Sequence, residues 1–204
     1  MEYKTIKDKN IAEIVEKKSK FIAQVFYIES KEEAEDIISE MKKEYYDARH
    51  NCYAYSVFNT EKNEVYTKYS DDGEPSGTAG VPILSVINGN NLVNVLIIVT
   101  RYFGGILLGT GGLVRAYKEA AEKVIDVSKL YRFIKGYEIK ILLDYNKWDN
   151  FTYYCKINGI NIISAEYFEK IECIFEISNE NFVDDNPYYN KNDIVRQKPI
   201  ISEF

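Results

Sequence analysis

Residues 93–117 read VNVLIIVTRYFGGILLGTGGLVRAY, and this stretch decides the fold. Residues 93–99 are almost wholly apolar, which predicts a strand buried on both faces of a sheet. A glycine-rich turn follows, and a helix starting near Thr110 is predicted to run to about Val127. The apolar stripe of that helix consists of Leu113, Ala116, Tyr117, Ala120 and Val124. A buried strand, a tight turn and an amphipathic helix therefore form the centre of the first predicted domain.

The sequence before this centre mixes strand and helix patterns. Ser30 and Glu33 have the spacing of a capping box, and Thr78 is a candidate cap for a second, short helix. The expected elements are strands over 11–16 and 21–26, a helix to about Tyr46, a strand over 50–58, a loop over 69–77 and a helix through Ile87. Because strands and helices do not alternate regularly, we expect an α+β fold rather than a doubly wound sheet.

A second pattern begins after residue 133. The expected elements are a strand from Tyr137, a helix with Trp148, Phe151 and Cys155 on one face that stops at Gly159, a hairpin over 160–167 and 171–177, and a last strand within 198–204. Residues 179–193 are polar and form a weak second helix at best. The order predicts a small ferredoxin-like domain over 137–204, after an N-terminal domain over 1–133.

Composition and charge exclude several classes of protein. The net charge is −6, which excludes a nucleic-acid-binding domain that is basic overall. Binding of RNA would require a local basic patch. The three scattered cysteines and the single His50 make a zinc site improbable, and no cofactor or metal is expected. The N-terminus lacks an apolar signal core, and the apolar runs are too short to span a membrane. We therefore expect a cytoplasmic protein.

The segment from Pro75 to Lys118 differs from the rest of the chain because it contains no Asp or Glu. Its charged residues are Arg101, Arg115 and Lys118. A glycine-rich loop before a helix N-terminus presents free N–H groups to an anion. The segment predicts a phosphate or carboxylate site. The structural alternative is that the glycines serve turns and close packing, while the arginines pair with Asp71, Asp72 or Glu74.

Other chemical motifs fit less well. The chain has neither a Walker loop nor the dinucleotide fingerprint G-x-G-x-x-G, which disfavours a nucleotide-driven enzyme. The acids Asp71, Asp72 and Glu74 could hold a hard cation, or form a solvated turn or the partners of the arginines. His50 and Cys52 are two residues apart on a strand, a spacing that suits a nucleophilic pair poorly. No catalytic residue is assigned.

The chain resembles the YigZ/IMPACT family. Four motifs and their continuation carry the resemblance: residues 18–23 (KSKFIA), 48–55 (ARHNCYAY), 70–80 (SDDGEPSGTAG), 99–109 (VTRYFGGILLG) and 111–117 (GGLVRAY). The resemblance implies an N-terminal fold like the second domain of a ribosomal small-subunit protein and a ferredoxin-like C-terminal domain. Eukaryotic relatives restrain a translation-control kinase by competing for its activator. For bacterial members, a role associated with RNA or ribosomes is inferred mainly from their folds.

We therefore expect a translation-associated binding protein whose partner is RNA, the ribosome or a translation-control protein, with no membrane. The candidate anion- or RNA-binding residues are Lys20, Arg49, His50, Ser76, Thr78, Arg101, Gly104, Gly105, Thr110 and Arg115. One alternative is an enzyme acting on a small anionic substrate, with Asp71, Asp72 or Glu74 as metal ligand or base. Another is a protein–protein adaptor in which the glycine-rich segment is purely structural.

Overall fold

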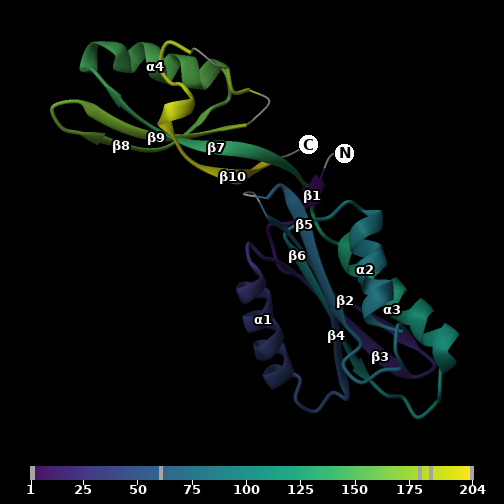
Figure 1. Ribbon diagram of the computed structural model, residues 1–204. Helices are drawn as coiled ribbons and strands as arrows, with labels where there is room; N and C mark the ends of the chain where they lie inside the picture. Colours follow the sequence, from purple (N-terminus) through teal and green to yellow (C-terminus); the bar gives the residue numbers. More distant parts are fainter. Residues whose placement is uncertain (1–2, 60–61, 179–180, 184–185, 203–204) are drawn as a thin grey trace. The chain divides into compact units, whose positions relative to one another are not determined.

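A computed structural model describes residues 3–59, 62–178, 181–183 and 186–202. The chain divides into two compact units, one extending to Arg132 and the other covering Phe133–Ser202. Both units combine antiparallel sheets with helices, which confirms the α+β class (Figure 1). No helix in the described residues is long and apolar enough to cross a membrane.

The first unit is built on a five-stranded antiparallel sheet of order β2-β3-β6-β4-β5. The strands are β2 (Asn10–Glu16), β3 (Ser19–Tyr27), β4 (His50–Asn59), β5 (Glu64–Ser70) and β6 (Val95–Tyr102). A short strand, β1 (Tyr3–Thr5), precedes them, and its Lys4 forms a bridge with Leu92. The predicted strands in this unit are confirmed.

Helices cover both faces of this sheet (Figure 1). On one face lies α1 (Lys31–Glu44), and on the other lie α2 (Gly80–Gly89) and α3 (Gly109–Asp126). In β6, the central strand, Ile97 packs into the core beneath α2 and α3, while Leu96 and Ile98 pack into the core beneath α1. The alternation of a strand sends neighbouring side chains to opposite faces, so two helical layers explain why the whole strand is apolar.

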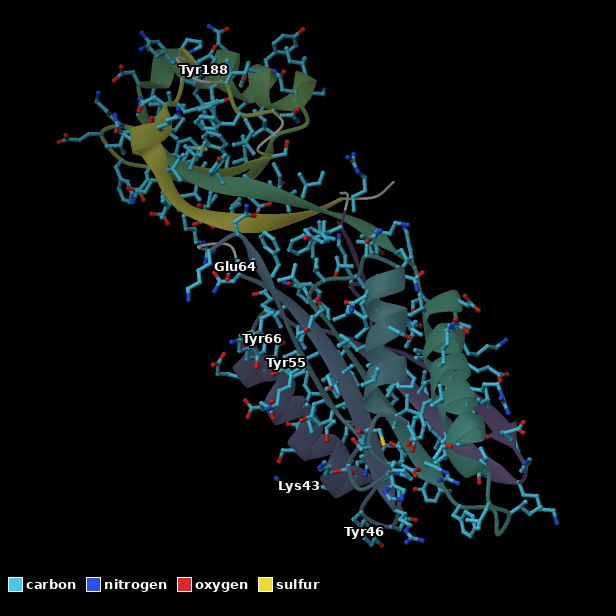
Figure 2. All side chains as sticks on the ribbon, turned by 45° about the vertical axis from the view of Figure 1, so that its right-hand side comes forward. Lys43, Tyr46, Tyr55, Glu64, Tyr66 and Tyr188 are labelled. Atoms are coloured by element: carbon cyan, nitrogen blue, oxygen red, sulfur yellow. The ribbon has the colours of Figure 1, made fainter. Side chains whose placement is uncertain are left out.

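Aromatic side chains fill the layer between the sheet and α1. Tyr53 and Tyr55 stack with their ring centroids 6.4 Å apart, and Tyr55 lies 6.1 Å from Tyr66 of β5 (Figure 2). The hydroxyl of Tyr55 donates a hydrogen bond of 3.2 Å to Glu35 of α1. Tyr53 and Tyr55 thus bury their rings, and Tyr55 keeps a polar partner at the edge, as expected for core and boundary positions.

The two helix starts differ in how well they were predicted. Ser30 caps α1 by accepting a hydrogen bond from the Glu33 N–H at 3.1 Å, as the capping box predicts. For α2 the prediction was wrong, because the Thr78 hydroxyl instead donates to the Pro75 carbonyl at 2.6 Å. The free N–H groups at the start of α2 are bound by the carboxylate of Asp71, from the preceding loop.

The second unit contains β7 (Tyr131–Leu143, beginning at the end of the first unit), α4 (Tyr145–Ile157), β8 (Asn161–Tyr167), β9 (Ile171–Ser178), the 3-10 turn η1 (Lys191–Asp193) and β10 (Ile194–Ser202). Strand β7 pairs with β9 and with β10, and β8 pairs with the far side of β9. The order β10-β7-β9-β8 is that of a ferredoxin-like sheet. In place of a second helix, the described part of the chain has only η1, in agreement with the weak pattern there.

Candidate functional site

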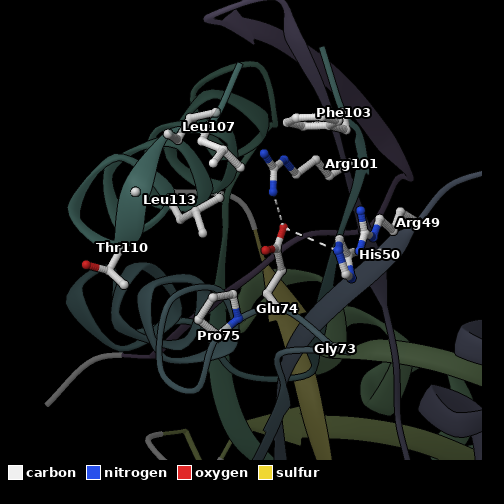
Figure 3. Close-up of a pocket in the computed structure, with 12 residues that line it drawn as sticks. Arg49, His50, Gly73, Glu74, Pro75, Arg101, Phe103, Leu107, Thr110 and Leu113 are labelled. Carbon is white, nitrogen blue, oxygen red and sulfur yellow. Dashed lines mark hydrogen bonds and ion pairs between the residues drawn. The ribbon is translucent and has the colours of Figure 1, made fainter. Parts of the chain in front are cut away.

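The first unit contains a pocket of about 480 Å³ (Figure 3). Its walls come from the start of β4, the loop before α2, the end of β6, and the loop that leads into α3. The lining residues are Arg49, His50, Gly73, Glu74, Pro75, Arg101, Phe103, Leu107, Leu108, Gly109, Thr110 and Leu113. The volume lies within the range of small-ligand sites, roughly 300–1,000 Å³.

A buried ion pair forms the floor of this pocket. Arg101 Nη1 lies 2.6 Å from Glu74 Oε1, and the two side chains are only 8% and 3% exposed (Figure 3). The hydroxyl of Tyr117, on α3, donates a second hydrogen bond of 2.8 Å to the same oxygen. The positive charge of Arg101 is therefore balanced within the protein, which is the structural alternative foreseen for this arginine.

Aromatic rings and a serine fix the Arg101 guanidinium in place. Its central carbon lies 5.5 Å from the ring centroid of Phe21 and 5.7 Å from that of Phe103. Nη2 lies 3.5 Å from the Ser19 hydroxyl, while the buried Nε has no hydrogen-bond partner among the described residues. This packing leaves Arg101 little freedom to leave Glu74 for another anion.

His50 is oriented by the loop that carries the acidic residues. Its Nδ1 lies 2.8 Å from the Asp72 carbonyl oxygen, which can only accept, so Nδ1 carries the proton. The other nitrogen, Nε2, lies 3.9 Å from Glu74 Oε1 and lines the pocket. The Asp72 carboxylate accepts a hydrogen bond from the Asn51 N–H at 2.7 Å and pairs with Lys42 at 2.6 Å.

Asp71 has a structural task in the same loop. Its carboxylate accepts hydrogen bonds from the N–H groups of Gly77, Ala79 and Gly80, at 2.8, 2.9 and 2.8 Å. Burial would raise the pKa of Asp71, but these backbone hydrogen bonds outweigh burial and leave the pKa below its ordinary value. A carboxylate bound in this way ties the loop to the start of α2.

The three acidic residues thus face different partners instead of converging on one point. Among the residues that the structure describes, no group of three His, Cys, Asp or Glu side chains is arranged to hold a metal ion. The arrangement gives no support to Asp71, Asp72 and Glu74 as a cation site.

Cys52 lies behind the floor of the pocket. Its sulfur lies 3.0 Å from the Asp71 carbonyl oxygen and 3.3 Å from the Tyr117 hydroxyl. Burial raises the pKa of the Cys52 thiol well above its ordinary value. A protonated, buried thiol is a poor nucleophile, so the geometry does not favour covalent chemistry through Cys52.

The mouth of the pocket offers a different chemistry from its floor. Phe103 is 45% exposed and Leu107 is 81% exposed, so large apolar side chains face solvent there. Arg49 is an exposed cation in the lining. Helix α3 begins in the lining at Gly109, and its first turn has neither a side-chain cap nor an acidic residue. This mouth can bind a group that combines a negative charge with an apolar body.

Of the anion-binding candidates, the structure brings together Arg49, His50, Arg101 and Thr110 and places the others outside the lining, while of the acidic candidates only Glu74 lines the pocket. Lys20 pairs with Glu13 at 2.6 Å, and Ser76 and Arg115 are exposed side chains that are not part of the lining. The remaining candidates are Thr78, Gly104 and Gly105. Gly104 has a packing role, because a Cβ there would overlap the backbone of Lys18.

Sequence reasoning missed the contributions of Tyr117, Phe103 and Leu107. Tyr117 is predicted only as part of the apolar stripe of α3, yet its hydroxyl completes the floor of the pocket. A signal existed for the other two, because large apolar side chains in a glycine-rich loop have no regular element in which to be buried. Exposed apolar groups of this kind often mark binding sites.

Comparisons with known proteins identify relatives of this chain. Residues 17–125 match the family model described as the Impact N-terminal domain. The IMPACT family member YvyE of Bacillus subtilis is 45% identical over 121 residues, which cover 59% of this chain and 54% of that protein. An IMPACT family member of Haemophilus influenzae is 36% identical over 162 residues, covering 79% of this chain and 78% of its own.

Among solved structures, a crystal structure described as a hypothetical protein aligns with a TM-score of 0.62 and 27% identity. The alignment covers 88% of this chain and 86% of the other, so both units have counterparts in that structure. Every residue that lines the pocket falls within the stretch matched by the family model.

Proposed function

The chain belongs to the IMPACT family, and from this membership we propose that it is a translation-associated regulatory protein that binds its partner through the pocket of the first unit. The resemblance to the family supports the link with translation, since eukaryotic relatives restrain a translation-control kinase. The proposal places the protein in the cytoplasm, where translation takes place.

The observation that carries the proposal is the chemistry of the pocket mouth. An exposed guanidinium, an uncapped helix N-terminus and exposed apolar side chains lie around one opening. Each of these features alone is common, and the helix dipole contributes only about 0.3–1 kcal/mol at an exposed site. Together they favour a partner that presents an anionic group.

The floor supports the mouth without taking part in binding the anion. Glu74 neutralises Arg101 and also accepts a hydrogen bond from Tyr117. These contacts link β6, α3 and the loop before α2 beneath the pocket. Arg49 replaces Arg101 and Arg115 as the residue proposed to meet the anionic group. This revises the expectation from the sequence, in which Arg101 and Arg115 were among the residues that bind the anion.

The proposal is tested by co-sedimentation of the protein with ribosomes and polysomes from cell lysate, across a series of salt concentrations. We expect association that is lost in Arg49→Glu and kept in Arg115→Glu, since Arg115 is an exposed arginine outside the pocket lining. Absence of association at every salt concentration contradicts the link with translation. Equal loss in both variants contradicts the role of the pocket.

A further inference from the structure

We infer that the pocket binds a protein segment in which an acidic side chain lies next to a bulky apolar one, and that it does not bind RNA. The inference rests on the proposed function in one respect, that the pocket is the binding site. It goes further in naming the chemical class of the partner.

Charge complementarity is the first argument. Glu74 is the acidic residue of the pocket lining, and its charge is engaged by Arg101 at 2.6 Å. No Asp or Glu occurs between Pro75 and Lys118, which includes the loop and the first turns of α3. An incoming carboxylate would therefore meet the Arg49 guanidinium and the N–H groups of α3, and among the described residues that line the pocket the only carboxylate is that of the engaged Glu74.

The number of available cations argues against RNA. Recognition of a nucleic-acid backbone depends on several lysines and arginines that each neutralise a phosphate. In this lining Arg101 is buried and paired, which leaves Arg49 as the exposed cation. The whole chain has a net charge of −6, so its net charge does not favour a polyanion. A single carboxylate needs only one such partner.

The apolar part of the mouth requires an apolar partner group. Leu107 is 81% exposed and Phe103 is 45% exposed, while Leu113 is buried deeper in the same lining. Burial of these side chains against a Leu, Ile or Phe of a partner is favourable, whereas a ribose–phosphate backbone offers little apolar surface. The Phe103 ring already lies against the Arg101 guanidinium, at 5.7 Å, which limits its use as a stacking platform for a base.

The test uses the full chain in a display experiment with random peptides. The wild type is compared with Leu107→Asp, and Leu142→Asp is the matched control, because Leu142 is 63% exposed on the second unit. We expect the wild type and the control to enrich peptides with Asp or Glu beside a large apolar residue. Leu107→Asp is expected to lose that enrichment.

The best enriched peptide is then measured by titration, together with versions in which Gln replaces the acidic residue or Ala replaces the apolar one. We expect each replacement, and Arg49→Glu in the protein, to weaken binding about tenfold. The acidic residue and Arg49 lose a charge-assisted contact, and the apolar residue loses its burial at the mouth. A ten-nucleotide oligouridylate is expected to bind at least about tenfold more weakly than the peptide.

Failure of the inference can be told apart from failure of the proposed function. The inference is overturned if the wild type enriches no such peptide more strongly than the Leu107→Asp variant does. It is also overturned if the oligouridylate binds as tightly as the peptide. If such a peptide binds but the protein does not sediment with ribosomes, the peptide site stands and the link with translation fails.

Discussion

In the Glu74–Arg101 pair, Glu74 neutralises the positive charge of Arg101. Because both side chains are buried, each charge needs the other to compensate it. Removal of a single member leaves an uncompensated charge in a site that water hardly reaches. The exposed Lys20–Glu13 pair has the same 2.6 Å separation but side chains that are 43% and 45% exposed. The two pairs differ in burial and hardly in geometry, so they form a natural comparison.

We predict that Arg101→Met lowers the free energy of unfolding by about 3–5 kcal/mol, because Glu74 becomes buried and unpaired. Lys20→Met is the control and is expected to cost about 0–1 kcal/mol. The double variant Arg101→Met/Glu74→Leu is expected to recover part of the loss, since it leaves no lone charge. Urea denaturation measures all three. An Arg101→Met variant as stable as Lys20→Met would show that the pair is not buried in solution.

At the residue scale, the sequence reveals which side chains are chemically unusual but not how they pair. The absence of acidic residues between Pro75 and Lys118 marks the region of the pocket. It cannot distinguish an arginine that awaits an anion from one already bound to Glu74, since this depends on a loop 27 residues away. Tyr117 is 43 residues from Glu74, so its contact was equally out of reach.

At the scale of elements, the loop that carries Asp71 replaces the usual local cap of a helix. The Asp71 carboxylate binds three N–H groups at and just before the start of α2, while Ala79 at the cap position has no side-chain acceptor. The folded-state pKa of Asp71 is depressed, so its contribution to stability is present above the unfolded pKa. It is lost as the pH falls through the folded pKa.

We predict that Asp71→Ala lowers the free energy of unfolding by about 0.5–2 kcal/mol at pH 7, as for other helix caps. The difference from wild type should shrink as the pH falls below about 4, because Asp71 of the unfolded chain then protonates while the folded chain still holds it ionised. Asp36→Ala, an exposed position on α1, is expected to change stability by less than about 0.5 kcal/mol. A constant difference between Asp71→Ala and wild type down to pH 2 would contradict this account.

The approach of Gly104 to the backbone of Lys18 fixes the end of β6 against the turn between β2 and β3. We predict that Gly104→Ala is destabilising by about 1–3 kcal/mol, since backbone must move to make room for a Cβ. Gly111→Ala is the control, because the nearest atom to its Cβ is 3.8 Å away and the residue lies in α3. Alanine there should stabilise by about 0.5–1 kcal/mol. Equal midpoints in thermal unfolding of the two variants would contradict this account.

Elements with strong patterns could be predicted from the sequence, and weakly patterned ones could not. The apolar run of β6 and the stripe of α3 are recognisable because they are buried by neighbours on a fixed side. Strand β5 (Glu64–Ser70) was missed because it lies at the edge of the sheet, is mostly exposed and has a mixed polar composition. An edge strand owes its structure to pairing with β4, which local sequence does not encode.

At the scale of the whole molecule, the two units have separate hydrophobic cores. The predicted boundary between residues 133 and 137 falls within β7 (Tyr131–Leu143), and the assignment of two folding domains stays a prediction. In the second unit, Lys140 pairs with Glu172, and Arg196 pairs with Glu138, on strand positions that alternate with those packed against α4.

We predict two unfolding transitions in differential scanning calorimetry. Phe151→Ala removes a fully buried ring from the core of the second unit. It should lower the free energy of unfolding by about 3–5 kcal/mol for one transition only. Ile97→Ala, in the core of the first unit, should lower the free energy of unfolding by about 2–5 kcal/mol for the other transition only. A single transition that both variants shift equally would contradict independent folding of the two units.

The central claim is that a protein of the translation machinery inserts an acidic and apolar segment into the pocket of the first unit. The most direct test places a photo-crosslinking residue at Leu107 in cells, with the same residue at Leu142 as control, and identifies the crosslinked segment by mass spectrometry. The account predicts a crosslink at position 107 to one such segment, absent at position 142 and abolished by Arg49→Glu. Crosslinks to RNA at position 107, or the same products at both positions, would contradict it.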